Sequence, residues 1–308
     1  MDGLMVFSTK RLVYEFSLMA ILAIRLACIP SFSNGQTSEK PNPQEAKAIA
    51  AIKEIGGSSK DGIVSFAGTK VTDSGLVNLK DLPTLDVLSL DLSDTKVTDI
   101  GLAHLKDLME LKWLYLDNTQ VTDAGLAHLK GLPKLEILYF NDTQVTDAGL
   151  VHLKDLSKLK VLYFFRTKVA DAGLAHLKGL TKLEQLYLND TQVTDAGLEH
   201  LKDLSELKGL YCIRTKVGDA GLVHLKGLTK LKYLYLYSTK VTDAGLAHLK
   251  GLTELDDLGL GHTQVSDAGL VHLKGMTNLL ILDINNTKVT DEGVKDLKKS
   301  LPSLRVYR

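Results

Sequence analysis

The stretch Leu183-Glu184-Gln185-Leu186-Tyr187-Leu188-Asn189-Asp190-Thr191-Gln192-Val193-Thr194-Asp195-Ala196-Gly197-Leu198 decides the fold of this 308-residue chain. Its second half, T-x-V-T-D-x-G-L, occurs ten times with small variations, and successive copies are 24 residues apart except for a first step of 26. A fixed period of this length indicates stacked units, none of which can bury its apolar face alone. The sequence therefore predicts one solenoid rather than two globular domains.

Each unit is expected to contain one short strand and one short helix. Apolar and polar residues alternate over 183–188, which predicts a strand with Leu186 and Leu188 pointing inward. A turn follows, and then a helix whose N-terminus is capped by Thr194 or Asp195. Since an Asp occupies the Asp195 slot in all ten units, helix capping is the role expected for this column. Three leucines are expected on the inner face of the helix, namely Leu198, Leu201 and Leu204.

The complete pattern, L-x-x-L-x-L-x-x-T-x-V-T-D-x-G-L-x-x-L-x-x-L-x-x, resembles the leucine-rich-repeat family over roughly residues 59 to 308. Its T-D-x-G-L signature is similar to that of exported bacterial repeat proteins of unknown or binding function. It is more distantly similar to the cysteine-containing repeats of F-box adaptors. The resemblance implies an α/β horseshoe with a concave parallel sheet of about eleven short strands and short convex helices.

The residues before the repeats are expected to form three segments. Residues 1–33 are predicted to be a signal peptide, because basic residues precede an apolar run and small residues follow it. The apolar run is shorter than the roughly 20 residues that a spanning helix needs, so no membrane span is expected after cleavage. Residues 34–43 are predicted to be a flexible linker and 44–58 an N-terminal capping helix. The repeats then occupy 59–308, and the chain is expected to be exported, or cytoplasmic if the leader does not function.

Composition favours a binding scaffold and offers little for other functions. Lys plus Arg and Asp plus Glu both number 37, so the chain has no overall charge that would attract nucleic acid, and no nucleic-acid partner is expected. Of the two cysteines, Cys212 occupies an inward strand slot and is expected to be a buried thiol. The recurring Asp and His columns have no accompanying nucleophile column, which argues against an enzyme. Parallel histidines one coil apart do not converge on one point, so neither a metal nor another cofactor is expected.

The outward strand slots contain the candidate binding residues. One slot is expected to begin with Ser89 and to continue with six tyrosines on adjacent strands, Tyr115, Tyr139, Tyr163, Tyr187, Tyr211 and Tyr235. The copied pattern changes beside this column at Trp113, Phe165, Ile213, Tyr233 and Tyr237. A neighbouring turn slot contains Arg166 and Arg214 between aspartates. Aromatic and arginine side chains dominate interface hot spots, so these residues predict a recognition face. The alternatives are tyrosines that stack on one another and arginines in ion pairs between coils.

The sequence thus favours a non-catalytic scaffold that binds a protein or peptide in its aromatic concave face. Because these side chains point away from the core, the fold is expected to survive their truncation. A second hypothesis is a glycan-binding module of the cell surface, since aromatic rings also stack on sugars. A third is an intracellular F-box-like adaptor, which would require a helical adaptor domain that residues 34–58 are too few to form.

Overall fold

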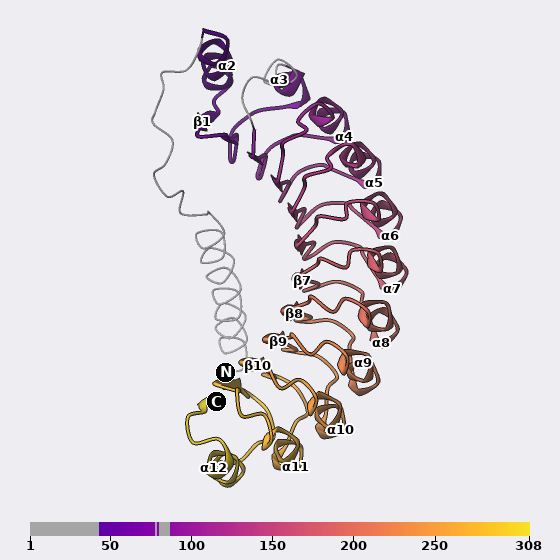
Figure 1. The fold of residues 1–308 in the computed structure, drawn as a ribbon, viewed down its shortest axis with the longest axis vertical. Coiled ribbons are helices and arrows are strands. Elements are labelled where there is room, and N and C mark those ends of the chain that lie inside the picture. The colour runs from indigo at the N-terminus through magenta and orange to yellow at the C-terminus, as the bar shows by residue number, and fades with distance from the viewer. Residues whose placement is uncertain (1–42, 78, 80–86) are drawn as a thin grey trace, which may run out of the picture. The chain divides into compact units, whose positions relative to one another are not determined.

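The computed structural model describes residues 43–77, 79 and 87–308, and Pro43–Arg308 form one compact unit. The predicted leader (1–33) and all but the last residue of the predicted linker (34–43) lie outside the described residues. Helices and strands alternate along the described unit. The strands stack one above the next and the helices lie on the opposite side of each coil (Figure 1).

The described residues contain a twelve-stranded sheet whose spatial order is the order of the chain. β1 pairs with β2 in the antiparallel sense, and every later pair, from β2–β3 to β11–β12, is parallel. The eleven strands β2 to β12 therefore confirm the predicted parallel sheet. The strands are β1 (Ser58–Lys60), β2 (Ile63–Ser65), β3 (Ser89–Asp91), β4 (Trp113–Tyr115), β5 (Ile137–Tyr139), β6 (Val161–Tyr163), β7 (Gln185–Tyr187), β8 (Gly209–Tyr211), β9 (Tyr233–Tyr235), β10 (Asp257–Gly259), β11 (Ile281–Asp283) and β12 (Arg305–Tyr307).

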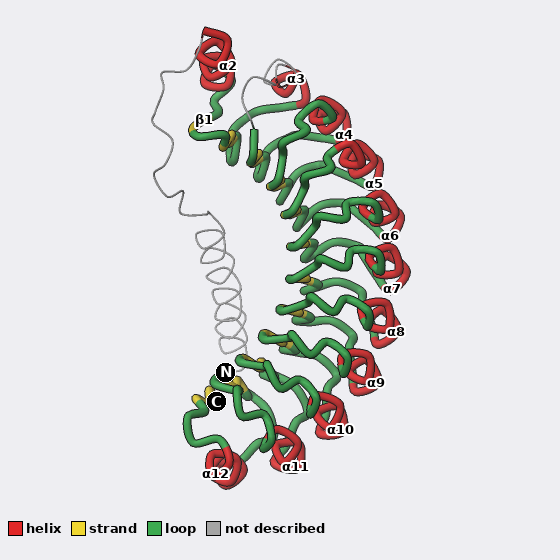
Figure 2. Tube along the Cα trace, viewed as in Figure 1, coloured by secondary structure: helices red, strands yellow, loops and turns green. Residues whose placement is uncertain are grey.

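Short helices form the convex side of the unit (Figure 2). The α-helices are α2 (Pro43–Glu54), α3 (Asp73–Leu76), α4 (Asp99–Leu102), α5 (Asp123–Leu126), α6 (Asp147–Leu150), α7 (Asp171–Leu174), α8 (Asp195–Leu198), α9 (Asp219–Leu222), α10 (Asp243–Leu246), α11 (Asp267–Leu270) and α12 (Asp291–Ser300). A 3₁₀ turn continues most of them: η2 (Ala103–Leu105), η3 (Ala127–Gly131), η4 (Val151–Leu153), η5 (Ala175–Leu177), η6 (Glu199–Leu201), η7 (Val223–Leu225), η8 (Ala247–Leu249) and η9 (Val271–Leu273).

The core is a continuous column of leucine and valine side chains between the sheet and the helices. In the coil that begins at β7, Leu186, Leu188 and Val193 are fully buried, and so are the helix leucines Leu198 and Leu201. Burying one such side chain contributes about 1.5–3 kcal/mol. Because every coil repeats these slots, each coil is stabilised mainly by the apolar surface of its neighbours. Cys212 replaces a leucine in this column and is fully buried, as predicted.

The T-D-x-G part of the phrase joins one coil to the next. Thr194 accepts a hydrogen bond from the backbone N–H of Ala196 and so caps α8. The same Thr194 gives its backbone N–H and its hydroxyl to the two carboxylate oxygens of Asp171 in the preceding coil, at 2.7 and 2.6 Å. Gly197 leaves room for that carboxylate, because a Cβ there would lie 2.5 Å from Oδ1 of Asp171.

This joint corrects the role predicted for the Asp column. The caps come from the preceding Thr or Ser side chain, for example Thr122 and Ser266, and the Asp is the first residue of each helix. The physical reason is geometric. The Asp side chain points from the start of its helix toward the next coil, where a backbone N–H and a hydroxyl donate hydrogen bonds to it. At Ala170 and Gly218 the hydroxyl is missing, and the Asp of the preceding coil binds only a backbone N–H.

The first Thr of the phrase closes the turn after each strand. The hydroxyl of Thr191 donates to the carbonyl oxygen of Leu188 at 2.6 Å, and equivalent bonds occur from Thr95 to Thr287. The residue before this Thr has a positive φ in every described copy from Asp94 (58°) to Asn286 (52°). Such a left-handed turn suits Asp and Asn better than most side chains. The turn therefore has a fixed backbone shape in which the side chain projects outward.

The helix α2 lies at the N-terminal end of the described unit. Its Ala48 and Ile52 are buried as part of the main hydrophobic core, and Ile55 just beyond it packs against that core. Gly57 allows a close approach, since a Cβ there would lie 2.5 Å from the Phe66 ring. Apolar groups of α2 thus contact the first coil, as the predicted capping helix requires. That the helix stabilises the first coils remains a prediction.

Candidate functional site

The outward strand positions form aligned columns on the concave face. The first and third residues of each strand point away from the core, and the register pairs Tyr115 with Tyr139 and so on to Tyr235. The expected start of this column is wrong. Asp91 pairs with Tyr115, whereas Ser89 pairs with Trp113. The two extra residues of the first repeat lie before β3, so β3 already follows the 24-residue register.

The tyrosines of this column stack on one another. The ring centroids of Tyr139, Tyr163, Tyr187 and Tyr211 are separated in turn by 3.9, 3.5 and 3.8 Å, with planes within 14° of parallel. At the ends the separations are wider, 4.9 Å from Tyr115 to Tyr139 and 5.0 Å from Tyr211 to Tyr235. Stacked rings of this kind attract one another beyond the area that they bury. The self-stacking alternative therefore describes the middle of the column.

The middle of the column is closed to solvent. Tyr139 and Tyr163 are 1% exposed and Tyr187 is 3% exposed. The Tyr187 hydroxyl donates to Oε1 of Gln185 at 2.8 Å, while that of Tyr163 has no hydrogen-bond partner among the described residues. Burial raises the pKa of both phenols, and it raises the pKa of Tyr211 to about 12. We call the three residues Tyr139, Tyr163 and Tyr187 the closed segment.

Side chains beside the column are also bonded within the protein. Asn141 and Asn189 each accept a hydrogen bond from the backbone N–H of the next coil, that of Phe165 or Ile213, at 2.8 and 2.9 Å. Both asparagines are buried, so their N-x-T sequences are unsuited to glycosylation.

The two predicted arginines form the ion-pair ladder that was the alternative reading of this slot. Arg166 Nε lies 2.6 Å from Asp142, and Arg214 Nε lies 2.5 Å from Asp190, in each case across one coil. The guanidinium of Arg166 also lies over the Phe165 ring, 4.3 Å from its centroid. Both arginines are therefore held in place before any partner arrives. Exposed pairs of this kind add only about 0–1 kcal/mol each to stability.

The concave face becomes more open at β9 and β10. Tyr233 is 38% exposed and begins β9, in which Tyr235 is the other outward residue, and Tyr237 follows just after the strand. The Tyr235 hydroxyl donates to Oδ2 of Asp257 at 2.5 Å. Burial raises the pKa of Tyr237, and the negative charge of the Asp283 carboxylate raises it further. We call these five residues, Tyr233, Tyr235, Tyr237, Asp257 and Asp283, the C-terminal patch.

Two glycines shape this patch. A Cβ at Gly259 would collide with the Tyr237 ring and lie 2.7 Å from the Tyr235 ring, and a Cβ at Gly261 would lie 2.8 Å from the Tyr237 ring. The rings therefore lie directly over backbone that carries no side chain. Burial raises the pKa of Asp257, which still accepts the Tyr235 hydrogen bond. The result is a rigid surface of aromatic edges and two carboxylates.

The structure thus brings the predicted residues to one face, but not as one uniform stripe. Trp113 and Tyr233 share the first outward column, while Phe165, Ile213 and Tyr237 share the slot just after the strand. The sequence interpretation missed Asp257, Asp283 and the two glycines. The signal was present, because the tyrosine column ends at Tyr235 and is followed by glycine and aspartate.

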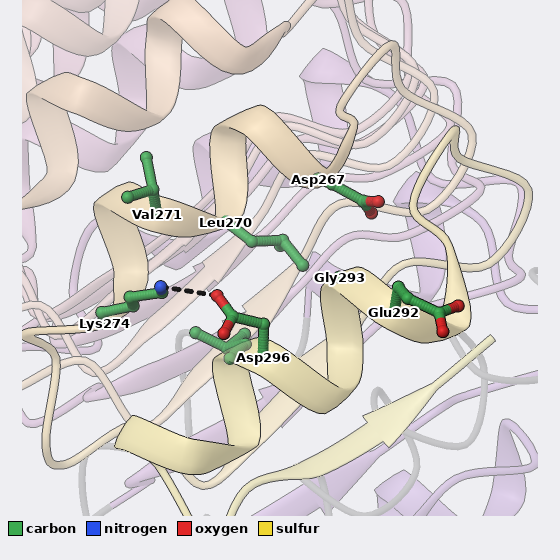
Figure 3. A pocket seen from close by; sticks show the side chains of 8 residues that line it. Asp267, Leu270, Val271, Lys274, Glu292, Gly293 and Asp296 are labelled. Carbon is green, nitrogen blue, oxygen red and sulfur yellow. Dashed lines mark hydrogen bonds and ion pairs between the residues drawn. The ribbon is translucent and has the colours of Figure 1, made fainter.

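Other features of the described residues supply no competing site. A hollow of about 320 Å³ lies between α11 and α12 (Figure 3). Three of its four charged lining residues are already partnered, since Asp267 binds Thr290 and Lys274 pairs with Asp296 at 2.6 Å. Among the described residues, no three His, Cys, Asp or Glu side chains are placed to share a metal ion. No described helix has the length and apolar character needed to cross a bilayer.

Comparisons with known proteins agree with this architecture. The leucine-rich-repeat family model matches residues 179–202 and 275–298. Among solved structures, the ectodomain of the receptor kinase GASSHO1/SCHENGEN3 from Arabidopsis thaliana, in complex with CASPARIAN STRIP INTEGRITY FACTOR 2, aligns with a TM-score of 0.50 and 17% identity. The alignment covers 77% of this chain and 33% of that one.

A second solved structure is an internalin (inlF) from Listeria monocytogenes, with a TM-score of 0.48 and 21% identity over 87% of this chain and 95% of the other. No curated protein sequence matches the chain. At these identities the solved structures show the fold alone. Ten copies of the repeat phrase, the matched family model and the stacked parallel coils together show that this chain is a leucine-rich-repeat protein.

Proposed function

We propose that this protein is a non-catalytic scaffold that binds a protein or peptide on its concave face, and that the C-terminal patch anchors the partner. The observation that carries the proposal is the exposure of Tyr233, which is 38% exposed in the first outward column of β9, next to the column that contains Tyr235. Rigid strands hold this surface, so little ordering entropy is lost on binding.

The chemistry of the patch favours a partner segment with a lysine or arginine. Asp257 accepts a hydrogen bond from Tyr235 and Asp283 accepts two from Asn285, but neither forms a salt bridge with a described residue, so a cation from a partner would meet two carboxylates without a cationic neighbour. The face of Tyr233 would add a cation–π contact, worth about 0.5–2 kcal/mol. The closed segment would contribute shape rather than contacts, because its rings are already covered.

The test begins with a displayed library of random peptides, from which binders of the purified full chain are selected. We expect lysine- or arginine-containing peptides to be enriched. Titration calorimetry with one such peptide would then compare Tyr233→Ala, Asp257→Asn and the convex control His176→Ala. Tyr233→Ala should weaken binding at least about 30-fold, as expected for a hot spot, while the control should bind like the parent chain.

Two results would contradict this proposal. If His176→Ala weakens binding and Tyr233→Ala does not, recognition occurs on the convex side. If no peptide binds but a neutral polysaccharide is retained in a Tyr233-dependent way, the glycan-binding alternative is correct. The third alternative, an intracellular F-box-like adaptor, would require the intact chain, beginning at Met1, to be found in the cytoplasm.

A further inference from the structure

A second surface lies on the convex side, at the C-terminal ends of the 3₁₀ turns. A lysine occupies this slot in eight successive coils, and we call the column the lysine stripe: Lys106, Lys130, Lys154, Lys178, Lys202, Lys226, Lys250 and Lys274. The first seven are exposed. Most of them directly follow their 3₁₀ turn as its C-cap, for example Lys178 after η5 and Lys226 after η7.

The stripe carries unneutralised charge although the chain is neutral overall. Lys274 pairs with Asp296 at 2.6 Å and Lys202 approaches Glu199 at 3.9 Å. The other six form no salt bridge with any described residue. Part of the compensating negative charge comes from the Asp residues that join successive coils. One of them is Asp171, whose carboxylate is hydrogen-bonded to the next coil. The joint aspartates and the stripe lysines therefore occupy separate columns.

The residue after each stripe lysine differs between coils. Aspartate follows the lysine in three coils, at Asp107, Asp155 and Asp203. Glycine follows it elsewhere, at Gly131, Gly179, Gly227, Gly251 and Gly275. A lysine at a helix C-terminus is also stabilised by the helix dipole. That interaction leaves its charged end group free in solvent.

We propose that the lysine stripe binds a flexible acidic polysaccharide. Adjacent strands lie about 4.8 Å apart, and the coils spread further on the outer side, so the stripe offers one cation per coil along an arc (Figure 2). A polymer with one carboxylate or sulfate on each sugar presents anions at comparable intervals. Lysine binds such groups as a mobile point charge without requiring one fixed geometry.

The convex curvature excludes two other classes of anion. Duplex DNA stays straight over about 150 base pairs, and a bilayer is flat, so either would meet only a few lysines at once. A single nucleic-acid strand could follow the arc, but it binds by stacking on aromatic side chains. The residues next to the lysines are instead leucine and glycine or aspartate, with histidine two positions before, as in His176-Leu177-Lys178-Gly179.

The experiment measures binding of sodium polygalacturonate to the full chain in dilute salt by titration calorimetry, with neutral dextran as the uncharged control. The stripe variant carries Lys178→Gln, Lys226→Gln and Lys250→Gln. The matched control removes the same charge from exposed lysines in the turn after the strand, with Lys168→Gln, Lys216→Gln and Lys240→Gln. We expect the stripe variant to bind at least about tenfold more weakly, and the control less than about threefold, because binding depends on local counterion release.

Three outcomes would overturn the inference. Equal losses in both variants would mean that only net charge matters. Tighter binding of duplex DNA or of anionic lipid vesicles than of polygalacturonate would assign the stripe to another anion. If polygalacturonate does not bind at all, the lysine stripe is not a polysaccharide-binding site. Tyr233→Ala should leave polygalacturonate binding unchanged, so this experiment tests the lysine stripe independently of the concave-face proposal.

Discussion

The concave face is closed in the middle of the tyrosine column and open at Tyr233, which lies in the neighbouring outward column. Tyr163 is 1% exposed between two stacked rings, while Tyr233, two strands after Tyr187, is 38% exposed. Residue type does not explain the difference, since both are outward tyrosines on parallel strands. The neighbours do: rings lie on both sides of Tyr163, whereas Tyr233, in the first outward column, lies between Gly209 and Asp257. Stacking between coils therefore decides which of these outward tyrosines is exposed.

The largest expected effect separates the two regions by stability. Tyr163→Ala should cost about 3–5 kcal/mol, as for a buried aromatic side chain, because it leaves a gap between two stacked rings. Tyr233→Ala should change stability by less than about 0.5 kcal/mol. Urea midpoints measured by circular dichroism would compare the variants. This expectation replaces the sequence-based one, that truncating any tyrosine of the column leaves the fold intact. Equal midpoints for the two variants would show that the closed segment is not part of the packed structure.

The second prediction uses alkaline pH to probe the stacked column. Burial raises the pKa of Tyr211 from the ordinary 10.0 to about 12, so between these pH values the unfolded chain is ionised while the folded chain keeps its proton. The stabilising contribution is complete below pH 10 and is lost as the pH rises to about 12, at about 1.4 kcal/mol per pH unit. Urea midpoints at several alkaline pH values should fall more steeply for the parent chain than for Tyr211→Phe. Parallel pH dependences would contradict the shift.

The third prediction compares two hydroxyls within the closed segment. The Tyr163 hydroxyl is buried and has no hydrogen-bond partner in the described part of the chain, so Tyr163→Phe should stabilise the protein by about 1 kcal/mol. The Tyr187 hydroxyl bonds to Gln185, so Tyr187→Phe should cost about 0.5–1.5 kcal/mol. Opposite shifts of the thermal midpoint are the expected result. A loss at both positions would show that Tyr163 has a hydrogen-bond partner.

The smallest effect concerns the joint behind the closed segment. Asp147 binds only the backbone N–H of Ala170, where other coils also supply a hydroxyl. Ala170→Thr should add this bond and about 0.5–1.5 kcal/mol, without altering the concave face. Ala170→Val, which has the same shape and no hydroxyl, is the control. If both variants gain equally, packing rather than the hydrogen bond is responsible.

The regular part of this structure could be predicted from the sequence because each repeat places the same residue types at the same positions. Leu186, Leu188 and Leu198 fall in the core as expected, and the 24-residue period implies the stack of parallel strands. The role of the Asp column could not be predicted from one unit alone. Its carboxylate is bound by the next coil, and that contact depends on how coils stack.

The candidate site was only partly predictable for the same reason. Arg166 and Arg214 were expected on the concave face, but only the three-dimensional spacing shows that each is paired with an aspartate one coil earlier. The overall neutrality of the chain likewise concealed the lysine stripe, because a sum of charges does not reveal where each charge is neutralised.

The sequence by itself determined the solenoid, the inward leucines and the buried Cys212, since these follow from periodicity and the cost of exposing apolar surface. Tertiary structure alone decided which outward side chains are free. Stacking closes Tyr163, an ion pair engages Arg214, and missing side chains at Gly259 and Gly261 set the environment of Tyr237. Exposure is a property of neighbours in space, and in a solenoid those neighbours lie a full coil away along the chain.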